Sequence, residues 1–386
     1  MKKFAKMSLV AAVAVAGTVA SAQPLAEAIK NVDVSGTVVY RYDDRNYDAS
    51  SAATAKGDLS KNNYKIAITA KSKVNDDVTA VTRFIVGSST DAGFVGLDYV
   101  SGADGQADVT LSNVYFSYTG IANTTVNVGK QGLTTPWTVA IDSDGNEQTG
   151  TGILALTNVG PVTIAGAYFN QHNLNASGEA KALLKGYEDI ATLGVMGNIG
   201  PVALDAWYLD MDDVFDSFTL GVSSKIDLDA VQLTLGARHT ELDLDGSSKD
   251  NSLTKIMLGA KMGIFGAKLN YGWTDSDGGL AALDNDAKTG MQGWTVQLNG
   301  VADAEYLQVG VNAQVLDSLN LAVNYHKLDK EIGNSDFTDE ELYLQATYKM
   351  SKNFGGYLRF GQNEFEHVGD KDQDGTIGRI QVQYSF

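Results

Sequence analysis

The chain has no cysteine, four prolines and four histidines among its 386 residues, while glycine occurs 41 times. Without cysteine it can form neither a disulfide framework nor a thiolate site, which suits a compartment where a stray thiol risks oxidation. Proline removes a backbone donor from a sheet, whereas glycine is tolerated at the turns, bulges and crowded positions of a curved sheet. A chain poor in proline and rich in glycine is therefore compatible with extensive β-structure.

The few histidines give little support for an enzyme. His172, His239, His326 and His367 have no spacing typical of a metal site. A hydrolase would need a nucleophile or an acid beside a positioned histidine, and the sequence indicates no such partner. His326 is expected to be a polar residue lining the interior of the fold. The sequence therefore predicts no catalytic residue and no required cofactor.

Basic residues are also scarce, with 29 Lys and Arg against 47 Asp and Glu and a formal net charge of −18. Nucleic-acid binding requires a basic footprint, so this balance argues against a nucleic-acid partner. The excess of acidic residues has two readings. It provides a soluble, self-repelling surface, or it places carboxylates in external loops, where divalent cations can bridge them to each other or to lipopolysaccharide.

The chain lacks an apolar run of the roughly twenty residues that a membrane-spanning helix needs. The longest apolar run, residues 7–20, follows Lys2, Lys3 and Lys6 and precedes the small residues Ala20-Ser21-Ala22. This order is typical of a cleaved secretory signal. Cleavage before Gln23 removes three lysines, so the mature charge becomes 26 minus 47, or −21. We expect a signal peptide at 1–22, a short N-terminal segment at 23–31 with a helical turn over 24–30, and one domain at 32–386.

Past residue 30 the dominant hydrophobic period is two. In residues 32–42 one face reads Val, Val, Gly, Val, Tyr, Tyr and the other reads Asp, Ser, Thr, Val, Arg. Similar alternation occurs at 64–68, 231–238, 342–348 and 380–384. Runs of about nine to twelve residues can cross a bilayer as tilted strands. A soluble β-sandwich would show the same alternation, usually in shorter strands.

The connections between these runs favour a membrane barrel over a sandwich. Short ones at 75–77, 160–161, 200–201, 227–229, 316–318 and 351–353 alternate along the whole chain with long polar ones at 44–61, 89–107, 131–150, 171–187, 276–302 and 366–376. Tight periplasmic turns and long external loops are typical of outer-membrane barrels. We therefore predict an all-β fold, a transmembrane antiparallel β-barrel, with 32–386 as an outer-membrane domain and 23–31 as a short periplasmic segment.

Counting the runs gives about eighteen strands, an even number as in single-chain bacterial barrels. Residues 125–131 make a short fifth strand, and 293–298 can be either a strand or part of the seventh long loop, so sixteen strands is the alternative. Several aromatic residues near strand ends suit an interfacial girdle, although core packing would also explain some of them. They are Tyr40, Tyr42, Trp207, Tyr208, Tyr271 and Trp273.

The C-terminal strand ends on Phe386, with Tyr384, Val382 and Ile380 on the same face. A terminal strand with an aromatic last residue is what the outer-membrane assembly machinery recognises in barrels. We therefore assign Phe386 and Tyr384 to an assembly signal.

Three stretches of the sequence are similar to one known family. They are 24–30 leading into 32–36 and 40–43; Gly129-Lys130-Gln131 with Leu133, Trp137-Thr138, Ala140-Ile141-Asp142 and Gly150-Thr151-Gly152; and Arg379-Ile380-Gln381 leading to Tyr384 and Phe386. In these stretches the chain resembles the major-outer-membrane-protein porins of the Campylobacter group. Residues 170–370 show compatible patterning without a distinctive motif.

The resemblance implies an eighteen-stranded homotrimeric porin whose third loop folds into the lumen. It also implies general diffusion of small hydrophilic solutes with some preference for cations. Some members of the family hold calcium in the pore, and of the acids involved only Asp142 has a match in this chain. Outer-membrane lipid, lipopolysaccharide and the assembly machinery are the expected partners.

The chemistry of a diffusion channel is the field and the width of its narrowest point. The loop 131–150 contributes three acids to a predicted constriction, and period two points five basic side chains inward, because lipid-facing Arg or Lys near the midplane would cost about 2–4 kcal/mol. The acids are Asp142, Asp144 and Glu147, and the basic residues are Arg41, Lys65, Arg83, Lys268 and Arg359. A basic wall facing an acidic loop would create a transverse field. The alternative is that these residues form ordinary ion pairs between strands.

Residues 370–377 reproduce the first half of a calcium-binding loop, with Asp370, Asp372 and Asp374 at positions 1, 3 and 5 and Gly375 at position 6. Position 12 is Gln381, where a bidentate Glu is expected. This segment has two interpretations. It is either a loop whose three acids bind calcium or an ordinary polar hairpin loop.

The sequence thus predicts a porin in the outer membrane of a Gram-negative bacterium, which forms a water-filled channel for small hydrophilic solutes and ions. Two alternatives are compatible with the long loops: a surface adhesin or structural barrel, and a channel specific for one class of solute.

Overall fold

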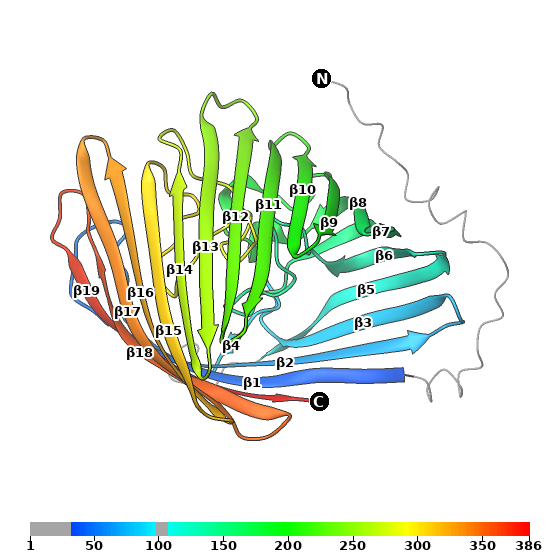
Figure 1. Cartoon of the computed structure of the whole chain (residues 1–386), viewed down its shortest axis with the longest axis horizontal. Coiled ribbons are helices and arrows are strands. Elements are labelled where there is room, and N and C mark those ends of the chain that lie inside the picture. Colours follow the sequence, from blue (N-terminus) through cyan, green and yellow to red (C-terminus); the bar gives the residue numbers. More distant parts are fainter. Residues whose placement is uncertain (1–31, 98–106) are drawn as a thin grey trace.

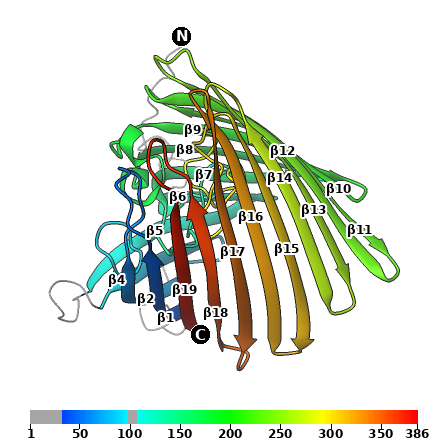
Figure 2. The same cartoon turned by 90° about the vertical axis from the view of Figure 1, so that its left-hand side faces the viewer.

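The structure is a computed structural model, and it describes residues 32–97 and 107–386. The predicted signal peptide, the segment 23–31 and its helical turn lie outside these residues. The chain folds into one sheet of tilted strands that closes into a barrel, as Figures 1 and 2 show from two sides. None of the described helices is long and apolar enough to cross a membrane.

The sheet contains eighteen long strands and the two-residue strand β4 within the described residues. The strands are β1 (Val32–Tyr47), β2 (Leu59–Lys73), β3 (Val78–Gly87), β4 (Val95–Gly96), β5 (Asp108–Ile121), β6 (Thr124–Gly132), β7 (Thr149–Val159), β8 (Val162–His172), β9 (Ile190–Ile199), β10 (Val202–Met211), β11 (Phe215–Leu228), β12 (Val231–Leu244), β13 (Asp250–Met262), β14 (Phe265–Thr274), β15 (Ala304–Leu316), β16 (Leu319–Ile332), β17 (Ser335–Lys349), β18 (Phe354–Phe365) and β19 (Gln373–Ser385). Two short helical segments, α3 (Leu174–Ser177) and η2 (Lys181–Leu183), lie between β8 and β9.

Each long strand pairs antiparallel with its neighbours along the chain, and β19 pairs with β1 to close the barrel. The closing seam ends on the last residue, where Phe386 N donates to Gly36 O at 3.0 Å and Gly36 N donates to Phe386 O at 2.9 Å. The prediction of an eighteen-stranded antiparallel barrel is confirmed, and the alternative of sixteen is wrong. Residues 125–131 belong to β6, whereas 293–298 lie in the connection between β14 and β15.

Side chains alternate between the lipid face and the interior, as period two requires. On β1 the odd-numbered residues Val39 and Arg41 are 7% and 5% exposed, whereas the even-numbered Val38 and Tyr40 are 42% and 39% exposed. The apolar residues that are exposed in the isolated chain therefore form the band that faces lipid.

The connections deviate from strict alternation in three places. The turns on one edge are short throughout, but on the other edge the connections 212–214, 245–249 and 333–334 are also short. The expectation that long loops alternate with turns along the whole chain is therefore wrong there. There β10–β11, β12–β13 and β16–β17 form hairpins, and the strands of the last two hairpins are 13–15 residues long (Figure 2).

Trp207 does not belong to the predicted aromatic girdle. Neighbouring residues of a strand point to opposite faces, and Tyr208 is on the outside with 46% exposure. The Trp207 ring packs over Gly194 in the interior, where an added Cβ on that glycine would come within 2.2 Å of the ring. It packs against the interior apolar cluster that contains Trp137 and Leu209.

Three external connections fill much of the interior. We name them loop 3 (residues 133–148), loop 4 (173–189) and loop 7 (275–303). Loop 7 is the yellow trace between the walls in Figures 1 and 2. Buried residues of these loops pack on inward-facing strand residues in two clusters, one around Trp137 and Leu283 and one around Trp294 and Tyr306. The barrel is therefore narrowed by packed loops rather than left as an open cylinder.

The two faces of β15 give a test of the barrel orientation. Val311 is 51% exposed on the outer face, and its neighbour Asn312 points into the barrel towards Asn320 of β16. We expect Val311→Arg to lower the free energy of unfolding by about 2–4 kcal/mol, the cost of a lipid-facing Arg near the midplane. Asn312→Arg should change it by less than about 0.5 kcal/mol. Unfolding by denaturant in lipid vesicles measures both, and equal effects would contradict the assignment of faces.

Candidate functional site

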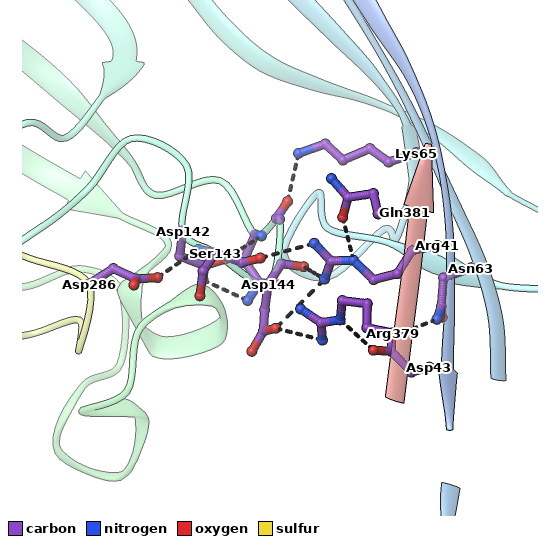
Figure 3. Close-up of polar contacts among 12 residues, drawn as sticks. Arg41, Asp43, Asn63, Lys65, Asp142, Ser143, Asp144, Asp286, Arg379 and Gln381 are labelled. Carbon is purple, nitrogen blue, oxygen red and sulfur yellow. Dashed lines mark hydrogen bonds and ion pairs between the residues drawn. The ribbon is translucent and has the colours of Figure 1, made fainter. Parts of the chain in front are cut away.

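Loop 3 lies inside the barrel, held by basic side chains of β1 and β2. Arg41 Nη2 donates to Ser143 O at 3.0 Å, and Lys65 Nζ donates to Gly145 O at 2.6 Å. Figure 3 shows both side chains reaching from the strands to the loop backbone. A carbonyl oxygen is a good acceptor for a cationic donor in a partly dry site. The predicted inward fold of the third loop is confirmed.

Glu147 anchors loop 3 at its C-terminal end, just before β7. Its Oε1 lies 2.9 Å from Lys65 Nζ and 2.7 Å from Arg83 Nη2, and its Oε2 accepts from Arg83 Nε at 2.9 Å and from the Ser112 hydroxyl. Burial raises the pKa of Glu147, but the hydrogen bonds from Arg83 and the charge of Lys65 outweigh it and hold that pKa below its usual value. The carboxylate is therefore ionised and fully partnered.

The structure thus brings Glu147, Lys65 and Arg83 together at a largely buried place, where the Arg83 side chain is 18% exposed. Glu147 is 1% exposed and Lys65 is 5% exposed. A buried ion pair that is broken on one side costs several kcal/mol, so this arrangement is a strong local constraint. We assign these three predicted constriction residues to the attachment of the loop rather than to the surface of a passage.

Loop 7 packs against the inner side of loop 3, an arrangement that the sequence did not predict. Leu283 N donates to Trp137 O at 2.9 Å, and Thr289 N donates to Pro136 O at 3.0 Å. At the tip of loop 3, Ser143 N donates to Asp286 Oδ2 at 2.6 Å. The sequence does contain a signal for this arrangement, because loop 7 was expected to be polar but has many apolar residues. They are Leu280, Leu283, Met291, Trp294, Val296 and Leu298.

The tip of loop 3 and the opposite wall enclose a cavity of about 230 Å³. Acidic side chains reach it from the loops, namely Asp144 of loop 3 and Asp286 of loop 7. Basic side chains reach it from the wall, namely Lys268 of β14, Arg359 of β18 and Arg379 of β19. Figure 3 shows Arg379 and Asp286 approaching the loop tip from opposite sides. The other residues that line the cavity are Ser143, Gln292, Gly293, Trp294, His326, Tyr343 and Tyr357.

Asp144 is the point where loop and wall meet. Its Oδ1 lies 3.7 Å from Arg41 Nη1 and 3.5 Å from Arg379 Nη2, and its side chain remains 62% exposed. Arg379 is itself held by an ion pair with Asp43, and Arg41 Nε donates to Gln381 Oε1 at 2.8 Å. Sequence reasoning missed Arg379, although it alternates with the outward-facing Ile380 in the same way that Arg41 alternates with Tyr40.

Arg359 and Lys268 carry charges that no described carboxylate neutralises, because neither forms an ion pair within residues 32–97 and 107–386. The Arg359 guanidinium carbon lies 4.8 Å from the ring centroids of both Trp294 and Tyr343. Its Nε donates to Gln345 Oε1 at 2.9 Å. Aromatic faces attract a cation without cancelling its charge. The two predicted residues therefore present net positive charge to the cavity.

Asp284 is buried and Asp142 is partly buried, and neither carboxylate forms an ion pair among the described residues. Burial raises the pKa of Asp142 to about 6 and that of Asp284 to about 7, and in each case neighbouring carboxylates add to the rise. Asp142 accepts two hydrogen bonds from Asn146, both at 2.8 Å, which close the turn at the tip. Asp142 therefore shapes the loop, while its neighbour Asp144 reaches the cavity.

The acids suggested for calcium do not suit that ion in this arrangement. Among the described residues no group of three or more His, Cys, Asp and Glu side chains has the arrangement of a metal site. Both carboxylate oxygens of Asp142 accept hydrogen bonds from Asn146. Asp370 Oδ2 accepts hydrogen bonds from Ser50 and Ser51 of the first loop. Asp372 lies in the last loop and Asp374 on β19. A calcium site needs six to eight converging oxygens, so we derive no role for calcium.

The anchor at Glu147 gives the first test of the site. Glu147→Gln removes the charge that neutralises Lys65 and Arg83, and breaking such a buried pair costs about 3–5 kcal/mol. We expect hydrogen exchange in residues 133–148 to accelerate strongly while strand amides stay protected. Asp317→Asn, in an exposed periplasmic turn, is the matched control. Unchanged exchange in loop 3 would contradict the anchoring role.

The raised pKa of Asp284 predicts a pH dependence of loop packing. In the unfolded chain this acid titrates near 3.8, whereas in the fold it titrates near 7. The folded state therefore binds more protons between these pH values, and stability falls as pH rises through the window. Asp142 acts in the same direction. Asp284→Asn should remove much of this slope, as measured by unfolding free energies from pH 4 to pH 8. A slope unchanged by the substitution would show that another group is responsible.

Comparison with known proteins agrees with this architecture. The barrel is similar to a BenF-like porin from Pseudomonas fluorescens (TM-score 0.76, 15% identity, covering 92% of this chain and 99% of that one) and to OccAB3 of Acinetobacter baumannii (TM-score 0.75, 15% identity, 92% and 99%). It is also similar to Pseudomonas aeruginosa OccK2, solved in complex with glucuronate (TM-score 0.72, 13% identity, 92% and 99%). At such identities the likeness shows the fold alone. A search of curated proteins found no significant match.

The family assignment comes from the sequence as a whole. The family model described as Campylobacter major outer membrane protein matches residues 1–383, and so extends through the region 170–370 where no single motif was distinctive. The resemblance seen in three stretches is thereby confirmed over essentially the whole chain. The chain belongs to the Campylobacter major outer membrane protein family, and its fold is that of an outer-membrane porin.

Proposed function

We propose that this porin passes small hydrophilic solutes and ions by diffusion along a route whose narrowest point is the cavity between the tip of loop 3 and the basic wall. The single observation that carries the proposal is the opposition of Asp144 and Asp286 to Lys268, Arg359 and Arg379 across that cavity. Opposed charges create a transverse field that orients dipolar solutes and hinders apolar ones, which must give up water without gaining a partner. Transport of this kind requires no catalytic residue and no cofactor.

The position of the loops inside the barrel favours a channel over an adhesin. Loops 3, 4 and 7 turn inward and pack on each other, as in the bond from Glu179 N of loop 4 to Leu283 O of loop 7 at 2.9 Å. Three of the other external connections have five residues or fewer. The connections 48–58 and 88–107 are also long, but three of the long loops elaborate the interior of the barrel, as a channel constriction requires.

A mild preference for cations is part of the proposal. The formal net charge of −18 comes from an excess of carboxylates, and a negative field raises the local concentration of cations near a mouth. At the cavity itself acids and bases are nearly balanced, so the preference should be weak. The proposal also includes a cleaved signal at 1–22, assembly through the terminal aromatic residues Tyr384 and Phe386, and a homotrimer in contact with lipopolysaccharide.

Ion selectivity tests this assignment directly. Unit charges 4 Å apart interact by about 1 kcal/mol even in bulk water, so removing one charge at the cavity should change the permeability ratio by up to about fivefold. We expect Asp144→Asn to shift the reversal potential in a potassium chloride gradient towards anions, and Arg359→Gln to shift it towards cations. Lys352→Gln, in an exposed turn, is the matched control for removal of a positive charge.

Planar-bilayer recordings of the refolded, signal-free protein supply this measurement. Opposite shifts from the two variants support a conducting path between Asp144 and Arg359. If folded protein conducts no current, diffusion through this barrel is excluded. If it conducts but both variants leave the reversal potential unchanged, the path lies elsewhere.

A further inference from the structure

We infer that the cavity selects small zwitterionic α-amino acids over neutral or singly charged solutes of the same size. This inference rests on the proposed function and adds to it the class of solute that the site accommodates. It follows from charged groups on opposite sides of the cavity, Arg359 and Lys268 on the wall and Asp286 on loop 7, that form no ion pair among the described residues.

The wall provides a place for a carboxylate. Within the described residues, the Arg359 Nη nitrogens and Lys268 Nζ have no hydrogen-bond partner and no ion-pair partner, and the only bond of the guanidinium is from Nε to Gln345. The rings of Trp294 and Tyr343 hold the Arg359 guanidinium in place at 4.8 Å. A preorganised guanidinium with unoccupied Nη groups binds a carboxylate in bidentate fashion at little entropic cost.

The loops provide a place for an ammonium group. Asp286 accepts one hydrogen bond, from Ser143 N, and no cation lies within ion-pair distance of it among the described residues. Asp144 shares its charge with Arg41 and Arg379 at 3.5–3.7 Å, yet its side chain is 62% exposed. Both carboxylates can therefore accept from a passing ammonium group without giving up a close ion pair.

One solute that carries both charges fulfils both requirements at once. A solute with only a carboxylate is attracted by Arg359 and Lys268 but repelled by the two aspartates, Asp286 and Asp144. A solute with only a positive charge is attracted by the aspartates and repelled by the two basic residues. A neutral solute can hydrogen-bond to the same ionised groups, but it lacks the attraction between opposite charges that a zwitterion gains at both of its ends. The volume of about 230 Å³ is below the roughly 300–1,000 Å³ of pockets for drug-sized ligands, so amino acids with small side chains fit best.

The experiment compares four solutes of one size. Alanine is the zwitterion, lactamide the neutral isostere, lactate the anion and alaninamide the cation. Their flux into vesicles containing the refolded full barrel is measured by mass spectrometry at neutral pH, with potassium chloride conductance recorded on the same preparation. We expect alanine to enter faster than lactamide by roughly three- to tenfold, the effect of about 1 kcal/mol of attraction between opposite charges. Lactate and alaninamide should both be slower than alanine.

Variants assign the preference to the two charge sets. Arg359→Gln and Asp286→Asn should each bring the ratio of alanine flux to lactamide flux close to one while lactamide still passes. Lys352→Gln and Asp317→Asn, in exposed turns far from the cavity, remove the same charges and should leave the ratio at its original value. Heat-modifiable electrophoretic mobility reports the folding of each variant.

Three results would overturn the inference. Equal flux of alanine and lactamide through the unmodified channel would mean that it does not select zwitterions. A ratio above one that survives both Arg359→Gln and Asp286→Asn would assign selection to another part of the barrel. Faster passage of lactate or alaninamide than of alanine would identify a channel for one sign of charge. In all three cases lactamide flux and conductance persist, whereas loss of both would overturn the proposed diffusion function as well.

Discussion

The buried carboxylate of Glu147 is the constraint on which the interior of this barrel depends. Lys65 and Arg83 reach it from β2 and β3 and Ser112 reaches it from β5, so three strands hold one loop residue. Because a buried, fully bonded carboxylate cannot lose a partner cheaply, residues 133–148 must enter the lumen and cannot fold back over the rim. The position of Asp144, three residues earlier, follows directly from that attachment.

Packing of loops 4 and 7 turns this single attachment into a rigid constriction. Trp137 of loop 3 is fully buried, and its indole Nε1 donates to Ser217 Oγ of β11 at 2.8 Å. Loop 7 then places Trp294 against the opposite wall, under Arg359. Aromatic packing therefore supports Arg359 and a backbone hydrogen bond supports Asp286, and neither residue forms an ion pair within the described part of the chain. A field across a narrow path requires such support, because mobile ions would otherwise pair and cancel.

The sequence was sufficient for the barrel and for about half of the site. Strand number and lumen-facing residues such as Arg41 and Arg359 follow from period two, which is a local property of the chain. The distinction between Glu147, which anchors, and Asp144, which faces the cavity, depends on which strands happen to be opposite each residue. No local pattern contains that information. Loop 7 was missed for a similar reason, since its apolar residues have no strand period, and they become interpretable only once Trp137 and Tyr306 are known to lie nearby.

The central claim is that the tip of loop 3 lines the conducting path, and the absence of cysteine from the chain makes it directly testable. In Asp144→Cys the introduced thiol is unique, and a side chain at this position is exposed to the lumen. Single channels of this variant should be recorded before and after addition of a bulky thiol-specific reagent. Our account predicts a stepwise fall in conductance when the introduced cysteine is modified. Complete modification, verified by mass spectrometry, with no change in conductance would contradict it.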